Sequence, residues 1–126
     1  MKKAVSSVED MDVFRKAHKI TVTIYEITKM FPQDEKFALV SQMRRAAYSI
    51  PSNLMEGGHR LNKKEYRQFV GISKGSAGEL KYFLLLSKDL NYISESEYSI
   101  LRESVEELSK MLGGLVKSLT DTDTGH

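Results

Sequence analysis

Apolar side chains recur along the chain at alternating intervals of three and four residues, the spacing of one face of an α-helix. Four stretches show this pattern and predict helices over about residues 9–31, 35–58, 62–90 and 94–119. No stretch shows the sustained apolar–polar alternation of a half-buried strand. Because the connections are short, consecutive helices are expected to be antiparallel neighbours. The sequence therefore predicts an all-α protein: one domain over residues 1–126, an up-down-up-down antiparallel four-helix bundle with frayed termini.

The second predicted helix contains the segment RRAAYSIPSNLMEGGHR, residues 44–60, which combines helical apolar spacing with an internal proline and a closing pair of glycines. Proline removes one backbone donor and kinks a helix, which leaves nearby carbonyl groups that need partners. We expect this helix to be kinked at Pro51, with Ser52 and Asn53 supplying local hydrogen bonds.

Polar residues follow a second regular spacing on this helix, on the side away from its apolar stripe. Arg45 and Glu56 lie about 16 Å apart along one helix, too far to pair directly. Each is therefore expected to pair with another helix, where Ser76 and Glu79 are candidates. We predict a partly buried polar network that fixes the register between helices or between subunits, and its members are Arg45, Ser52, Asn53, Glu56, Ser76 and Glu79. The alternative is an exposed polar face.

Three glycines recur inside the third predicted helix, at Gly71, Gly75 and Gly78. Each costs about 1 kcal/mol relative to alanine in a helix interior, so together they cost about 3 kcal/mol. A solvent-exposed face gains nothing from them, so we interpret them as a close-packing site for another backbone. That backbone belongs either to a neighbouring helix of the same chain or to a second subunit. The alternative is a locally loose helix.

Charge is unevenly distributed along the chain. The formal net charge is only +2, but residues 44–88 hold nine Lys/Arg against three Glu, a net of +6. Residues 94–119 hold three Lys/Arg against five Glu, a net of −2. On the third helix a cation recurs every seven residues, about 10 Å apart, which suits a phosphate backbone. The candidate nucleic-acid-binding residues are Arg60, Lys63, Lys64, Arg67, Lys74 and Lys81. The alternative is an ordinary solvated face.

The composition makes several other classes of protein improbable. There is no cysteine, which rules out disulfides and thiolate metal sites. The three histidines are scattered, without a neighbour at metal-ligand spacing, and no nucleophile or phosphate-binding glycine loop accompanies Glu56 and Glu79. We therefore expect no metal, no cofactor and no catalysis. No apolar run approaches the roughly 20 residues of a membrane span and no signal peptide is visible, so we expect a cytoplasmic protein.

The runs QMRRAAYSIPSNLMEGGHR and EYRQFVGISKGSAGELKYFLLLSKDL closely resemble the 23S rRNA intervening-sequence protein family of small four-helix bundles. The resemblance covers roughly Asp12 to Leu119, and Met55, where the family often has alanine, is a small departure. The matching positions are Arg44, Arg45, Ala46, Ser49, Ile50, Pro51, Asn53, Leu54, Glu56, Gly57, Gly75, Ser76, Glu79 and Leu80.

The resemblance implies a bacterial protein with a nucleic-acid-binding role. A similar bundle is the accessory protein of diversity-generating retroelements, a basic homopentameric barrel. By that likeness, the chain is expected to form a ring-shaped homo-oligomer, a pentamer, which binds RNA or DNA, with structured RNA preferred. The alternative is an oligomeric scaffold or accessory protein whose partner is another protein, with no nucleic-acid role. No aromatic residues interleave the candidate cations in the sequence, so no base-stacking platform is expected beside them.

Overall fold

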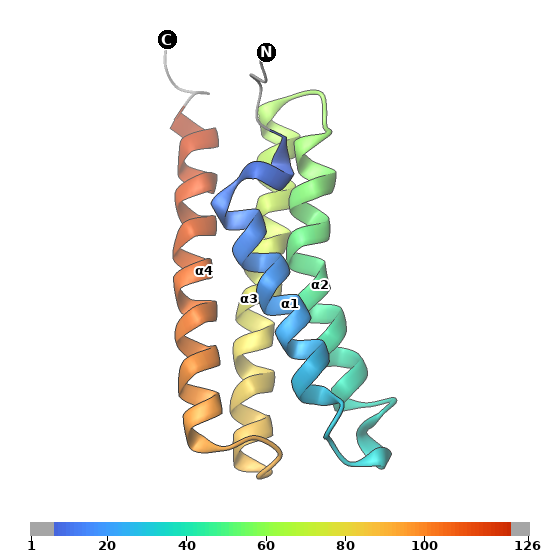
Figure 1. Cartoon of the computed structure of the whole chain (residues 1–126). Helices are drawn as coiled ribbons and strands as arrows, with labels where there is room; N and C mark the ends of the chain where they lie inside the picture. The colour runs from blue at the N-terminus through green and yellow to red at the C-terminus, as the bar shows by residue number, and fades with distance from the viewer. Residues whose placement is uncertain (1–6, 122–126) are drawn as a thin grey trace.

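The computed structural model describes residues 7–121 as a bundle of four α-helices in which consecutive helices run in opposite directions (Figure 1). The described residues contain no strand, so the predicted all-α bundle is confirmed. The predicted fraying of the termini concerns residues outside this range. The helices are α1 (Asp12–Thr28), α2 (Leu39–Gly58), α3 (Lys63–Asp89) and α4 (Glu95–Asp121), with 3-10 turns η1 (Val8–Asp10) and η2 (Gln33–Glu35).

The connection between α1 and α2 is longer than the sequence pattern predicts. The chain tightens into 3-10-type turns after α1, where the Phe31 amide donates to the Thr28 carbonyl at 3.2 Å. A second 3-10 turn, η2, follows Pro32 before α2 begins. The Glu35 carboxylate then accepts from the Leu39 amide at the start of α2, at 3.4 Å. The first helix therefore ends three residues earlier than expected, and the second begins four residues later.

The starts of α3 and α4 are fixed by side-chain caps, which satisfy amides that have no partner within the helix. The Asn62 side chain accepts from the Glu65 amide at 2.9 Å. At α4, Ser94 Oγ accepts from the Glu97 amide at 3.0 Å, and the Glu97 carboxylate accepts from the Ser94 amide at 2.8 Å. These caps set the boundaries of the two longest helices.

Apolar stripes from all four helices meet in one core. Ile24 of α1, Ile50 of α2, Leu80 of α3 and Leu108 of α4 are all fully buried there. The α3 helix packs along both α2 and α4, whereas α1 packs along α2 and less extensively along α4. No helix within residues 7–121 is both long enough and apolar enough to cross a membrane.

The α2 helix continues through Pro51, and buried hydroxyl groups bond to its backbone there. In a regular helix the amide of residue 51 would donate to the Ala47 carbonyl, but proline has no amide hydrogen. Thr21 Oγ1 of α1 instead lies 3.1 Å from the Ala47 carbonyl oxygen, and it shares its one hydrogen with the Ala17 carbonyl of its own helix, at 2.8 Å. Ser73 of α3, also buried, donates to the Ile50 carbonyl at 2.8 Å. The proline is thus tolerated because neighbouring helices supply donors; the kink itself stays a prediction.

Candidate nucleic-acid interface

The row of cations on α3 lies along its seam with α4. Arg67 Nη1 approaches the Leu119 carbonyl oxygen near the end of α4, at 3.5 Å. Lys74 Nζ lies 3.4 Å from the hydroxyl of Ser109. Further along, the ammonium group of Lys88 lies 4.8 Å from the centre of the Tyr98 ring. The row predicted from one helix therefore faces a second helix and is not a bare stripe of charge.

Lys81 is the member of the row most clearly engaged by an acidic residue. Its Nζ lies 3.0 Å from Glu106 Oε2 on α4, and Arg102 approaches the same oxygen at 3.4 Å. The hydrogen bond and the charge of Lys81 lower the pKa of the Glu106 carboxyl group, and the nearby Arg102 and Lys110 contribute. Because Lys81 is already paired, it is a weaker phosphate contact than the sequence suggested.

This ion pair predicts a pH dependence of stability. A carboxyl group whose pKa is lower in the folded than in the unfolded chain contributes stability above its unfolded pKa, about 4.3 for glutamate. That contribution is lost as the pH falls through the lowered folded value. Lys81→Met is therefore expected to lower the urea midpoint near neutral pH, and the difference from wild type should vanish towards pH ~3. A gap that persists in acid would contradict this role, and Lys19→Met is the matched control.

The other end of the row is less neutralised. Lys63 and Lys64 are exposed in the first turn of α3, and no carboxylate among the described residues bonds to either. Arg60, in the preceding loop, lies 3.2 Å from Glu56 Oε2, and its guanidinium group covers the Phe69 ring at 4.6 Å. The available positive charge is therefore concentrated where α3 begins.

The α4 helix adds a cation that the sequence analysis did not include. A side chain built at Gly113 would lie 3.5 Å from Lys74 Cε, so Gly113 faces the basic row. Lys117 is exposed, and its position one helical turn after Gly113 places it on the same face of α4. We call this region the basic edge and define it as Arg60, Lys63, Lys64, Arg67, Lys74 and Lys117. Only the packing of two helices brings these residues together.

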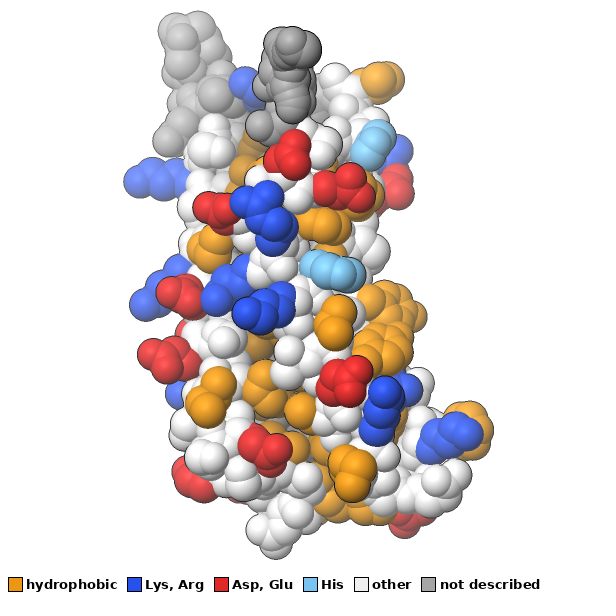
Figure 2. Space-filling view, in the orientation of Figure 1, with side chains coloured by type: hydrophobic (Ala, Val, Ile, Leu, Met, Phe, Trp, Pro, Cys, Tyr) orange, Lys and Arg blue, Asp and Glu red, His pale blue; other side chains and the backbone are white. Residues whose placement is uncertain are grey.

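The opposite face of the bundle has a different charge pattern. Figure 2 shows the side formed by α4, α1 and α2, where basic and acidic side chains intermix with apolar patches and form no continuous basic band. For example, Lys16 of α1 lies 2.8 Å from Glu107 of α4. This pairing and the charge of Lys16 lower the pKa of Glu107.

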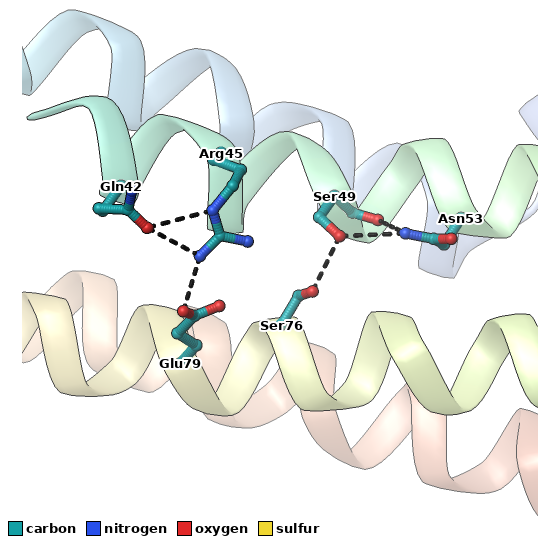
Figure 3. Close-up of polar contacts among 6 residues, drawn as sticks. All are labelled: Gln42, Arg45, Ser49, Asn53, Ser76 and Glu79. Carbon is teal, nitrogen blue, oxygen red and sulfur yellow. Dashed lines mark hydrogen bonds and ion pairs between the residues drawn. The ribbon is translucent and has the colours of Figure 1, made fainter.

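Polar side chains bridge α2 and α3 in two separate clusters (Figure 3). In the first, Arg45 Nη2 lies 2.6 Å from Glu79 Oε2, and Gln42 Oε1 accepts two further bonds from the same guanidinium group. In the second, Ser76 Oγ donates to Ser49 Oγ at 2.9 Å. The pairing of Arg45 with Glu79 is the one that the sequence analysis proposed. It lies within one chain, so it fixes the register between helices.

Ser49 and Gln42 are members of these clusters that the predicted network omitted. Asn53 Nδ2 donates to both the carbonyl and the hydroxyl of Ser49, at 2.8 and 3.0 Å. Ser49 belongs to the regular polar spacing of Arg45, Ser52 and Glu56 that the sequence shows on this helix, but it was not assigned to the network. Ser52 itself is exposed and approaches only the Ser49 carbonyl, at 3.4 Å.

The expectation that Glu56 pairs with another helix is wrong. Its partner is Arg60, four residues later in the chain. Because α2 ends at Gly58, the chain turns and brings Arg60 back over Glu56. The pair fixes the α2–α3 connection and does not contact the clusters around Arg45 and Ser49.

The glycines of α3 do not pack against another helix of the same chain. Gly71, Gly75 and Gly78 are exposed, and a Cβ atom built at each would meet nothing within 4 Å. The expectation that a helix of the same chain packs on these glycines is therefore wrong, because they lie on a side of α3 that contacts neither α2 nor α4. Close approaches occur at Gly57, where an added Cβ would lie 2.9 Å from Phe69 Cβ and from Tyr66 Cδ1, and at Gly58, where it would overlap Val8 Cγ2. Packing of a second subunit on the α3 glycines stays a prediction.

Large apolar side chains flank the exposed glycines. Ile72 is 51% exposed and Tyr82 is 57% exposed, and Leu85 extends the same side of α3. This side of α3 therefore presents exposed apolar side chains beside positions that have no side chain. Such a surface is typical of sites that contact another protein.

The structure also brings together two histidines that are far apart in the sequence. His18 of α1 and His59, which follows α2, both line an open hollow of about 600 Å³ between these helices, as does Glu56. His59 Nδ1 lies 2.8 Å from the Met55 carbonyl oxygen, so this nitrogen is engaged by the backbone. Among residues 7–121 there is no group of three His, Cys, Asp or Glu side chains suited to a metal ion.

Comparison with known proteins identifies a family and shows a similar fold among solved structures. A family model described as 23S rRNA-intervening sequence protein matches residues 9–114. No curated protein matches the chain. Among solved structures, the chain is similar to a protein of unknown function from the S23 ribosomal protein family of Bacteroides thetaiotaomicron VPI-5482. The TM-score is 0.77 and the identity 24%, over 83% of this chain and 95% of that chain. At this identity the likeness concerns the fold alone.

Proposed function

From the chain's membership of the 23S rRNA-intervening sequence protein family, we propose that it is a non-enzymatic, cytoplasmic protein that binds nucleic acid through the basic edge. The observation that carries the proposal is that lysines of the basic edge are exposed and are not neutralised by carboxylates in the described part of the chain. Lys63 and Lys64 are exposed and have no carboxylate partner among the described residues, and Lys74 bonds only to a hydroxyl group.

The basic edge suits a phosphate backbone better than base edges. It brings lysines and arginines from α3, α4 and the α2–α3 loop to one surface. Such side chains attract polyanions by releasing counterions, a contribution that does not depend on base sequence. We infer that the ligand is structured RNA, held by its phosphates. The paired Lys81 contributes less than the sequence analysis proposed.

Reversing two charges tests the proposal. The variant Lys63→Glu/Lys64→Glu is expected to bind a labelled RNA hairpin about tenfold or more weakly. The slope of log affinity against log salt should fall by about 2, because two phosphate contacts are lost. Fluorescence anisotropy at several salt concentrations measures both quantities. The control is Lys19→Glu/Lys29→Glu, which makes the same change in net charge on α1 and at the residue that follows it. Equal binding by the two variants, or a flat salt dependence in the wild type, would contradict the proposal.

The same chain is proposed to act as a homo-oligomer, with the glycine face of α3 as the contact between copies. The exposed glycines beside Ile72 and Tyr82 support this, because a single chain gains nothing from them. A ring of five copies follows from the family likeness stated above.

The second candidate function is that of an oligomeric scaffold whose partner is a protein. It is favoured by one observation, the pairing of Lys81 with Glu106, which shows that part of the cation row stabilises the bundle itself. This candidate predicts weak RNA binding without salt dependence, so the experiment above separates the two functions.

A further inference from the structure

Three exposed aromatic side chains surround an open groove of about 380 Å³ at the end of the bundle where α1 is joined to α2. They are Tyr25 of α1, Phe37 of the connection and Tyr48 of α2, which are 38%, 88% and 48% exposed. The sequence analysis did not group these three residues, because they are far apart along the chain and it considered only aromatic residues beside the cations of α3. Folding places all three at one groove, on helices other than those that form most of the basic edge.

One arginine is fixed against this aromatic surface. The guanidinium carbon of Arg44 lies 4.6 Å from the centre of the Tyr25 ring. Arg44 Nε donates to Thr28 Oγ1 at 2.9 Å, and Nη2 donates to the Tyr25 carbonyl at 3.2 Å. These two bonds anchor the guanidinium group at the groove, and among the described residues Nη1 has no partner. A tyrosine ring and an anchored guanidinium group are surfaces on which a nucleobase stacks.

The charge of the groove complements a polyanion. Two further cations line it: Lys36, whose ammonium group lies 5.5 Å from the centre of the Phe37 ring, and Arg45. Arg45 is paired with Glu79, but no carboxylate is among the lining residues of the groove. The hollow beside His18 differs, because Glu56 lines it. Aromatic rings interleaved with cations are the combination that holds single-stranded nucleic acid.

We propose that this groove binds single-stranded nucleic acid, with unpaired bases stacked on Tyr25, Phe37 and Tyr48 and phosphates held by Lys36 and Arg44. The inference deepens the proposed function and rests on its nucleic-acid role, but it uses a different surface. It adds a preference for unpaired nucleotides, which the basic edge alone does not provide. Bases within a duplex are stacked on one another and are unavailable to the rings.

A single tryptophan reports directly on stacking. The chain contains no tryptophan, so the variant Phe37→Trp has one fluorophore at the groove. Ile100→Trp places the same fluorophore on an exposed position of α4, away from the groove, and is the matched control. We expect a labelled single-stranded RNA of mixed sequence to quench Phe37→Trp, the corresponding duplex to quench it much less, and Ile100→Trp to stay unchanged.

Loss of the ring gives the second measurement. Phe37→Ala is expected to fold normally because the side chain is almost fully exposed, and to weaken single-strand binding about tenfold. Binding of the duplex should be unaffected. Unchanged single-strand affinity, or a Phe37→Trp emission that shifts with protein concentration without RNA, would overturn the inference; the second result would mean that another copy covers the groove.

The outcomes separate the two proposals. RNA binding that is lost in Lys63→Glu/Lys64→Glu but never quenches Phe37→Trp would overturn the stacking groove and leave the basic edge in place. Quenching that survives the lysine substitutions would support the groove, and it would contradict the basic edge if hairpin binding by that variant is also unchanged. Absence of binding by the wild type to either RNA would contradict both.

Discussion

Replacing Gly71, Gly75 and Gly78 together with alanine raises the free energy of unfolding of the isolated chain by about 3 kcal/mol. Each alanine gains helix propensity because it restricts the unfolded chain and shields the helix backbone. Nothing opposes the gain, since a Cβ atom at each position meets no atom within 4 Å. Urea denaturation at low protein concentration, followed by circular dichroism, measures the change.

The same variant is expected to lose assembly, because three methyl groups would hold a partner backbone away from α3. The mass of the particle in solution, measured by light scattering or sedimentation, reads this out for wild type and variant. A variant that gains stability but keeps the wild-type mass would show that copies do not meet on this face. A wild-type protein that is monomeric in solution would likewise contradict contact between copies on this face.

Gly57→Ala is the matched control for the glycine variant. The added methyl group would lie 2.9 Å from Phe69 Cβ, closer than real Cβ contacts, so the α2–α3 contact must shift. The expected result is a loss of about 1–3 kcal/mol, the usual cost of overpacking. The two sets of alanines should therefore act in opposite directions, although both replace helical glycines.

Thr21→Val lowers the free energy of unfolding by about 1–3 kcal/mol, because it leaves the buried Ala47 carbonyl without a donor. The substitution keeps the branched shape of the side chain and removes the hydroxyl group that lies 3.1 Å from that oxygen and 2.8 Å from the Ala17 carbonyl oxygen of its own helix. Thr23→Val is the control, since Thr23 Oγ1 donates only to Lys19 of its own helix. It should change stability by less than about 0.5 kcal/mol.

A double-mutant cycle with Pro51→Ala identifies the cause of this loss. Alanine at position 51 supplies the amide that proline lacks, and in a regular helix this amide donates to Ala47. In that background Thr21→Val should cost less by about 1 kcal/mol. If the cost is equal in both backgrounds, the hydroxyl does not replace the missing amide, and the loss comes from its bond to the Ala17 carbonyl of its own helix.

The three- and four-residue spacing of apolar residues was sufficient to predict the helices, because one buried stripe per helix is the main requirement of a bundle. The largest boundary errors lie around Pro32 and at the start of α1, which begins at Asp12 and not at residue 9. Around Pro32, the tightening of the chain into 3-10 turns depends on local hydrogen bonds that apolar spacing does not report. The pairing of Arg45 with Glu79 was also predictable, because helices joined by a short connection must be antiparallel neighbours.

The partners of the charged residues and the packing around the glycines could not be predicted from spacing along one helix. The spacing of Lys81 on α3 indicated a free cation, but Glu106, which engages it, lies 25 residues away on α4. The glycines of α3 and Gly57 look alike in the sequence, and only packing distinguishes an open face from a close approach. Tyr25, Phe37 and Tyr48 share no spacing that would have grouped them.

The sequence by itself determined the number and approximate extent of the helices and which face of each is buried, since these follow from local propensity and apolar periodicity along one element. The tertiary structure decided which cations are neutralised, which glycines lie close to another segment of the chain, and which aromatic rings meet at one groove. Those properties depend on distances between side chains of different helices, and these distances exist only once the helices have packed.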